Sequence, residues 1–261
     1  MLLLLSGEGP TDLGFCSNSQ TKCDGQDFMP GPLTLLIDQL FGERLGYSVL
    51  EIGAFRFVGK TALVERAAEL KAKPKSAKLP GKKRAKETTF YYTNARALAR
   101  IAIDLESSDR GQVVAVLFRD NDGTASFDRG EFDRKYQSMM NGFEEEHFER
   151  GVPMLALPKS EAWILCAVKQ KYQNCEALES RPGNDASPNS LKNELKEHLG
   201  DVPDRDRLNK LVQDGSIVAA KIAMPSFEKF RIRLVSLLSN IVAEGFEIHE
   251  DELNQLQDKD E

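Results

Sequence analysis

The stretch VVAVLFRDND, residues 113–122, decides the fold of this 261-residue chain. Its first six residues are apolar and include three valines, and Asp120 and Asp122 follow closely. A continuous apolar run of this length is typical of a strand buried on both faces of a parallel sheet. Two aspartates spaced by one residue, on extended chain leaving such a strand, are expected to direct both carboxylates towards one pole of the sheet.

Strand candidates alternate with helical segments over the first 160 residues. The other strand candidates are residues 2–5, a segment within 46–58 and 153–157, and helical spacing occupies 33–45, 61–70, 93–105 and 131–150. Strand alternating with helix predicts an α/β fold, with a mainly parallel four-stranded sheet flanked by helices.

After residue 160 the pattern is helical only. It is clearest at 191–199, 204–212 and 227–242, and Ser226 supplies a start for the last helix. From residue 244 on, the chain carries eight acids against one lysine. We therefore expect an α/β domain over 1–160, a helical lobe packed on it over 161–243, and an acidic tail over 244–261.

The charge of the chain is distributed unevenly. A net charge of -6 excludes a uniformly basic nucleic-acid-binding surface, so attraction to phosphate must come from a local patch. Residues 71–86 are too polar for a core, and we expect a flexible basic loop that grips a nucleic-acid backbone; a solvated insertion without a partner is the alternative. The loop holds eight basic residues: Lys71, Lys73, Lys75, Lys78, Lys82, Lys83, Arg84 and Lys86.

The start of the chain and its cysteines bear on location. The apolar run of residues 1–5 is too short for a secretion signal or a membrane span, so no membrane association is expected. The spacing of the four cysteines, at positions 16, 23, 166 and 175, does not match zinc-ligand pairs. The simplest interpretation is a cytoplasmic chain with reduced, unconnected cysteines.

An acid among glycines follows the first strand candidate. Glu8 stands between Gly7 and Gly9, which allow a sharp turn and close approach of the backbone to a ligand. Together with Asp120 and Asp122 it predicts three carboxylates at one end of the sheet. Because such carboxylates repel one another, a cation must compensate them, and their hard oxygens suit Mg²⁺, with Mn²⁺ as a substitute.

A calcium-binding EF-hand loop also opens with Asp-Xaa-Asp-Gly. Counted from Asp120, its sixth position needs glycine but holds Ala125, and a strand stands where a helix should enter. Magnesium is therefore favoured over calcium.

The glutamate after the first strand and the later Asp-Xaa-Asp resemble the TOPRIM domain, shared by topoisomerases, bacterial primases and nucleases of the overcoming-lysogenization-defect class. Residues 157–163 and 215–230 add a resemblance to an uncharacterised TOPRIM-like family from prokaryotic anti-phage defence and mobile-element loci. The resemblance covers most of residues 2–240.

The resemblance implies roles for individual residues. Glu8 would be the general acid or base, Asp120 and Asp122 would hold the metal, and Asp12 and Glu161 would support them. Arg119, which precedes the aspartate pair, could neutralise the acids or clamp a phosphate, and a salt bridge on the rim is the alternative.

We expect a Mg²⁺-dependent nuclease that hydrolyses DNA or RNA, as effector or subunit of an anti-phage defence system. None of the five tyrosines has a recognisable nucleophile context, which disfavours a topoisomerase. The alternative is a non-catalytic TOPRIM-like binding subunit docking onto an ATPase partner, because the chain lacks a complete ATP-binding phosphate loop. A phosphatase acting through Asp120 is a third hypothesis, and homo-oligomerisation stays open.

Overall fold

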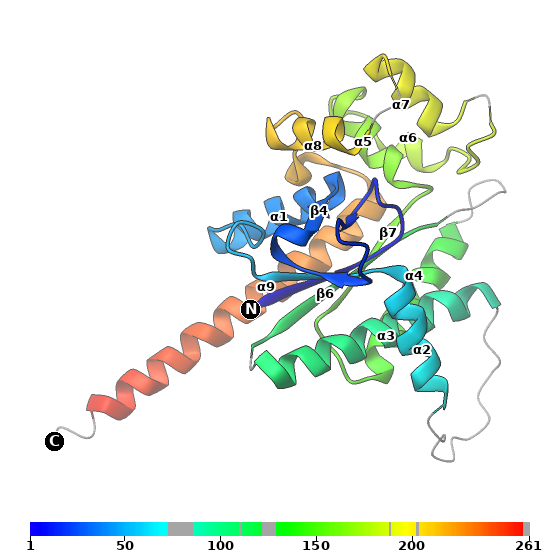
Figure 1. Cartoon of the computed structure of the whole chain (residues 1–261). Helices are drawn as coiled ribbons and strands as arrows, with labels where there is room; N and C mark the ends of the chain where they lie inside the picture. The colour runs from blue at the N-terminus through cyan, green and yellow to red at the C-terminus, as the bar shows by residue number, and fades with distance from the viewer. Residues whose placement is uncertain (73–85, 110, 122–128, 188, 202–203, 258–261) are drawn as a thin grey trace.

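The architecture comes from a computed structural model of the chain (Figure 1). The structure describes residues 1–72, 86–109, 111–121, 129–187, 189–201 and 204–257.

A five-stranded sheet in the order β3-β5-β1-β6-β7 forms the centre of the molecule. Four strands run parallel: β1 (Leu2–Ser6), β5 (Phe55–Val58), β6 (Val113–Asp120) and β7 (Gly151–Ala156). The mainly parallel α/β sheet is therefore confirmed. The fifth strand, β3 (Lys22–Cys23), pairs antiparallel with β5 at the edge.

Three short strands in the loop after the first strand were not predicted. Besides β3, strands β2 (Gly14–Cys16) and β4 (Phe28–Pro30) form a separate antiparallel pair. Segments of two or three residues are too short to show a periodic pattern. A single 3-10 turn, η1 (Gly25–Asp27), precedes β4.

Helices cover both faces of the sheet because side chains of β6 alternate between two cores. Val114, Val116 and Phe118 pack in one core, which includes α1 (Pro32–Leu45) and α9 (Pro225–Gln257). Their neighbours along the strand pack in the other core, against α3 (Lys86–Asp109) and α4 (Arg129–Glu145), with α2 (Lys60–Ala72) beside α3.

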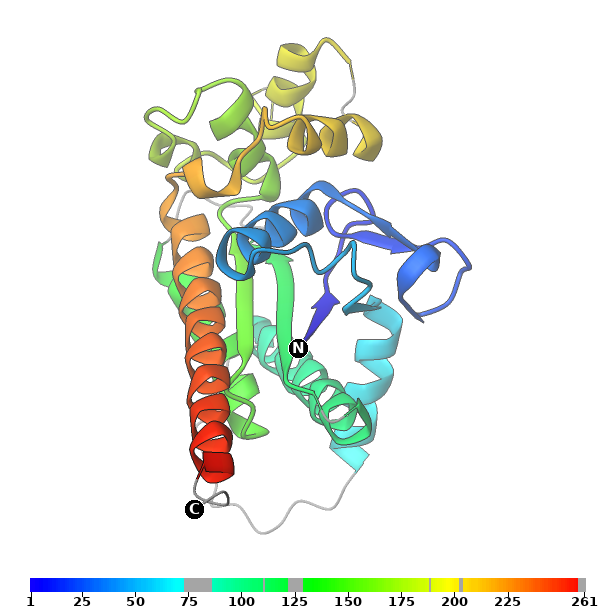
Figure 2. The ribbon, with the colours of Figure 1, turned by 90° about the vertical axis from the view of Figure 1, so that its left-hand side faces the viewer.

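The C-terminal region is helical, as predicted. Helices α5 (Ser160–Val168), α6 (Glu176–Glu179), α7 (Leu191–Leu199) and α8 (Arg205–Gln213) lie beyond one end of the sheet, followed by the 3-10 turn η2 (Ala219–Lys221) (Figure 1). Helix α9 then returns along β7 (Figure 2). It runs to Gln257, well past the predicted end at residue 242.

The interpretation of the cysteines as reduced and unconnected is wrong. The structure contains two disulfides, Cys16–Cys23 and Cys166–Cys175. Folding brings their Cα atoms to 5.7 and 5.1 Å, within the range that a disulfide requires. Sequence spacing could not show this proximity.

No helix in the described ranges combines the length and the apolar character needed to cross a bilayer.

Candidate functional site

A tight turn after β1 brings Asp12 back over the ends of the parallel strands. Gly9 has φ +83°, and the Asp12 backbone N–H donates to the Gly9 carbonyl at 3.0 Å. A Cβ on Gly7 would lie 2.3 Å from a methyl carbon of Leu13, and one on Gly9 would lie 2.1 Å from Asp12 Oδ2. A side chain at either position would therefore displace the Leu13 or Asp12 side chain, and at Gly9 the positive φ adds strain.

Ser160 joins two of the acids. Its hydroxyl donates to Asp12 Oδ1 at 2.5 Å, and its backbone N–H donates to Asp120 Oδ1 at 3.0 Å. Ser160 is the first residue of α5 and directly follows the turn that leaves β7, so three segments distant in sequence meet here. The N–H groups and dipole at the start of α5 favour the negative charge of the acids.

Burial and neighbouring acids perturb Asp12. Loss of solvent contributes most to raising the pKa of its carboxyl to about 6; the Ser160 hydrogen bond opposes the rise, and the charges of Glu161 and Glu8 add to it. Lys159 acts in the opposite direction but is the weakest influence, and it also pairs with Asp185 at 3.0 Å. The acids are thus close enough to repel one another without full compensation.

The predicted acids therefore assemble in part. Glu8 and Glu161 lie within electrostatic reach of Asp12, and Asp12 is linked through Ser160 to Asp120. All four acids are partly exposed, so a ligand can reach them. Asp122 lies outside the described residues.

Arg119 is buried at the end of β6, and among the described residues no acidic side chain forms a salt bridge with it. Its side chain is 1% exposed, and one of its nitrogens donates to the Phe118 carbonyl at 2.6 Å. Burial lowers the pKa of the guanidinium, and the charge of Glu8 acts against that shift. Tyr91, which sequence reasoning missed, donates its hydroxyl to the Asp120 carbonyl at 3.1 Å.

Most of the predicted basic loop, residues 73–85, lies outside the described residues. Lys73, Lys75, Lys78, Lys82, Lys83 and Arg84 lie outside the described residues. Lys71 is exposed near the end of α2, and Lys86 begins α3.

The acid cluster can supply oxygen ligands to a magnesium ion. Within the described residues, no three histidine, cysteine, aspartate or glutamate side chains are arranged to hold a metal ion. Mg²⁺ keeps several waters, however, and usually takes only one or two carboxylates from protein. The carboxylates of Glu8, Asp12 and Asp120 fit this requirement by their chemistry, and burial together with neighbouring acids raises the pKa of Asp12.

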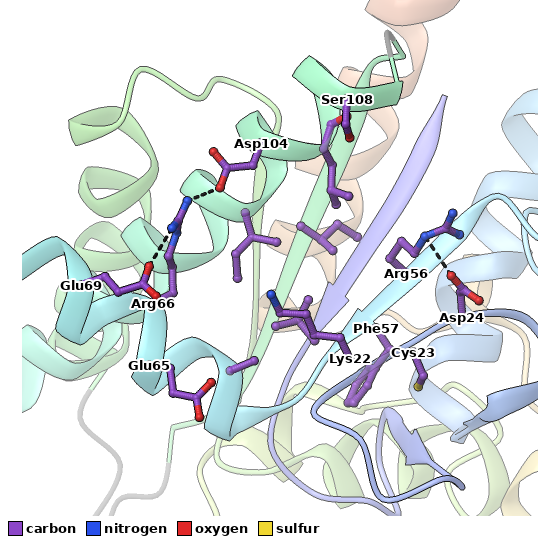
Figure 3. A pocket seen from close by; sticks show the side chains of 15 residues that line it. Lys22, Cys23, Asp24, Arg56, Phe57, Glu65, Arg66, Glu69, Asp104 and Ser108 are labelled. Carbon is purple, nitrogen blue, oxygen red and sulfur yellow. Dashed lines mark hydrogen bonds and ion pairs between the residues drawn. The ribbon is translucent and has the colours of Figure 1, made fainter.

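A separate hollow of about 400 Å³ lies between α2, α3 and the β5 edge, and none of the predicted acids lines it (Figure 3). Three of the carboxylates that line it pair with arginines. Arg66 pairs with Glu69 at 2.7 Å and also with Asp104, and Arg56 pairs with Asp24 at 3.0 Å. The charge pairs of this hollow thus involve none of the residues of the acid cluster.

The chain matches no family model, no curated protein and no solved structure.

Proposed function

We propose that the protein is a Mg²⁺-dependent nuclease that hydrolyses phosphodiester bonds of DNA or RNA. The observation that carries the proposal is the hydrogen-bonded connection from Asp12 through Ser160 to Asp120, with Glu8 close enough to raise the pKa of Asp12. A cluster of acids at the carboxyl ends of parallel strands, one of them a buried carboxyl with a raised pKa, calls for a cation.

In this proposal, different residues bind the ion, orient the carboxylates and hold a proton. Glu8 and Asp120 would hold the ion, which when bound would polarise a phosphoryl oxygen and stabilise charge on the leaving oxygen. Ser160 orients Asp120 through its backbone N–H and Asp12 through its hydroxyl. Asp12, with a pKa of about 6, can hold or accept a proton beside Glu8 near neutral pH.

The biological setting rests on the TOPRIM-like sequence resemblance. It would make the protein an effector or subunit of an anti-phage defence system in the cytoplasm. There the two disulfides would have to persist against cellular reductants.

Cleavage assays on single- and double-stranded DNA and RNA, with Mg²⁺ or Mn²⁺, test the proposal. We expect Glu8→Gln and Asp120→Asn to lower the cleavage rate on the order of 100-fold or more, because each removes a negative charge from the cation site. Asp104→Asn, an acid of the hollow, is the matched control and should cleave at the wild-type rate. Undiminished cleavage by the first two variants would refute the proposal.

A further inference from the structure

Arg119 carries hydrogen-bond donors that no described residue satisfies. It stands one position before Asp120 at the end of β6, and its side chain is 1% exposed. Within the described part of the chain, its Nε and Nη2 atoms are buried and have no acceptor. A buried guanidinium is normally paired with a carboxylate or another acceptor, because unpaired burial of a charge is costly. The unmatched donors therefore indicate that an acceptor comes from outside the described residues.

An exposed aromatic ring lies against this guanidinium. The Phe90 ring centroid lies 5.5 Å from Cζ of Arg119, and Phe90 is 39% exposed. The contact attracts the cation to the ring face but satisfies none of the N–H donors. Since Phe90 is the more exposed member of the pair, its rotation towards solvent would uncover Arg119.

We propose that Arg119 binds a phosphate oxygen of the substrate, which reaches the guanidinium when the Phe90 ring turns outward. This inference rests on the proposed function, since it names the substrate group that binds beside the carboxylates. The planar guanidinium fork matches the oxygens of a phosphate, and a charge-assisted hydrogen bond would satisfy the unmatched donors.

The position of Arg119 relative to the acids fits this role. Glu8 is close enough to act on the charge of Arg119 and also on that of Asp12. A phosphate bound by Arg119 would thus lie next to the carboxylates that are proposed to hold the cation. One oxygen could face Arg119 while the scissile bond faces the acids.

Titration of the metal-free 261-residue chain with inorganic phosphate, followed by calorimetry, tests the inference without requiring turnover. We expect Arg119→Met to weaken phosphate binding about tenfold or more, because the charged donors are lost. Phe90→Ala should tighten it, because the cover is removed. The melting temperature of Arg119→Met should be unchanged or higher, since an unpaired buried charge is replaced by an apolar side chain.

Arg205 and Phe15 provide a matched control pair. Arg205 lies 5.1 Å from the Phe15 ring, and Phe15 is 40% exposed, but Arg205 is paired with Asp206 at 2.7 Å. Arg205→Met and Phe15→Ala should leave phosphate affinity unchanged.

Three results would overturn the inference: unchanged phosphate affinity in Arg119→Met, a melting temperature lowered by several degrees in that variant, or acetate binding as tightly as phosphate. The outcome is separable from that of the proposed function. Phosphate binding that depends on Arg119, without cleavage of any nucleic acid, would retain the anion site and reject the nuclease. Cleavage that depends on Glu8 and Asp120, with phosphate binding independent of Arg119, would retain the nuclease and reject the anion site.

Discussion

The acid cluster and the hollow beside α2 and α3 both contain charged side chains, but they differ in how acidic side chains are paired with basic ones. In the hollow, Glu69 and Asp104 share Arg66, and Asp24 pairs with Arg56. In the acid cluster, burial raises the pKa of Asp12 to about 6, and the charges of Glu161 and Glu8 add to the rise. Acids paired with arginines are common on exposed protein surfaces. A buried acid with a raised pKa beside other acids instead indicates a site for a ligand.

Among the proposed variants, Gly9→Ala should have the largest effect on stability and on cation binding by the acid cluster. A Cβ at Gly9 would lie 2.1 Å from Asp12 Oδ2, in addition to the strain of φ +83°. We expect a loss in the free energy of unfolding of about 3 kcal/mol, from backbone strain and steric overlap together, and displacement of Asp12. Denaturant unfolding measures the loss, and calorimetry with Mn²⁺ measures the expected loss of cation binding.

Gly53→Ala is the control for Gly9→Ala. Gly53 also has positive φ, at +70°, but a Cβ there meets nothing within 4 Å. It should therefore show the backbone strain alone and retain cation binding. Equal behaviour of the two variants in the binding measurement would mean that the turn does not position Asp12.

Asp12→Asn should stabilise the metal-free protein at neutral pH. The folded pKa of about 6 exceeds the ordinary value of 3.8, so between these values the folded state binds more protons than the unfolded state. Stability contributed by Asp12 is therefore present below about pH 4 and is lost as the pH rises to about 6. Asparagine does not titrate, so the variant should gain up to about 3 kcal/mol at pH 7 and nothing below pH 4.

Unfolding curves of Asp12→Asn and wild type across this pH range check the expectation. Adding Mg²⁺ at pH 7 should narrow the difference, because a bound cation favours the charged carboxylate of the wild type. A variant that is less stable than wild type at pH 7 without metal would show that Asp12 is compensated after all.

The smallest effect is expected in the hollow. Asp104→Asn weakens an ion pair with Arg66 in which the Asp104 side chain is 60% exposed. Exposed pairs contribute little, so the free energy of unfolding should fall by less than about 1 kcal/mol. A larger loss, measured by the same denaturant titration, would mean that this ion pair is more than an ordinary surface pair.

Much of the fold could be predicted from the sequence because long apolar runs mark buried strands. Residues 113–118 and 2–5 correspond to β6 and β1, and their pairing places the following acids at one end of the sheet. The short strands β2, β3 and β4 have no comparable pattern. The disulfides depend on proximities that only the folded chain creates.

The site could be predicted less completely than the fold. Acid types and their positions after strands predicted Glu8 and Asp120, and the TOPRIM resemblance implied Asp12, but a serine at the start of α5 gave no signal of its own. Ser160 acquires its role only because the start of α5 meets two other segments. Phe90 and Tyr91 likewise matter through the packing of α3 against β6. The predicted role of Asp122 stays a prediction.

Calorimetric titration with Mn²⁺ tests the central claim, that the acid cluster holds a divalent cation, most directly. We predict one ion bound per chain, lost in Glu8→Gln and Asp120→Asn and kept in Asp104→Asn. At pH 6, binding should also release protons from Asp12, measurable by comparing buffers of different ionisation enthalpy. No binding by the wild type, or equal binding by all four proteins, would contradict the account.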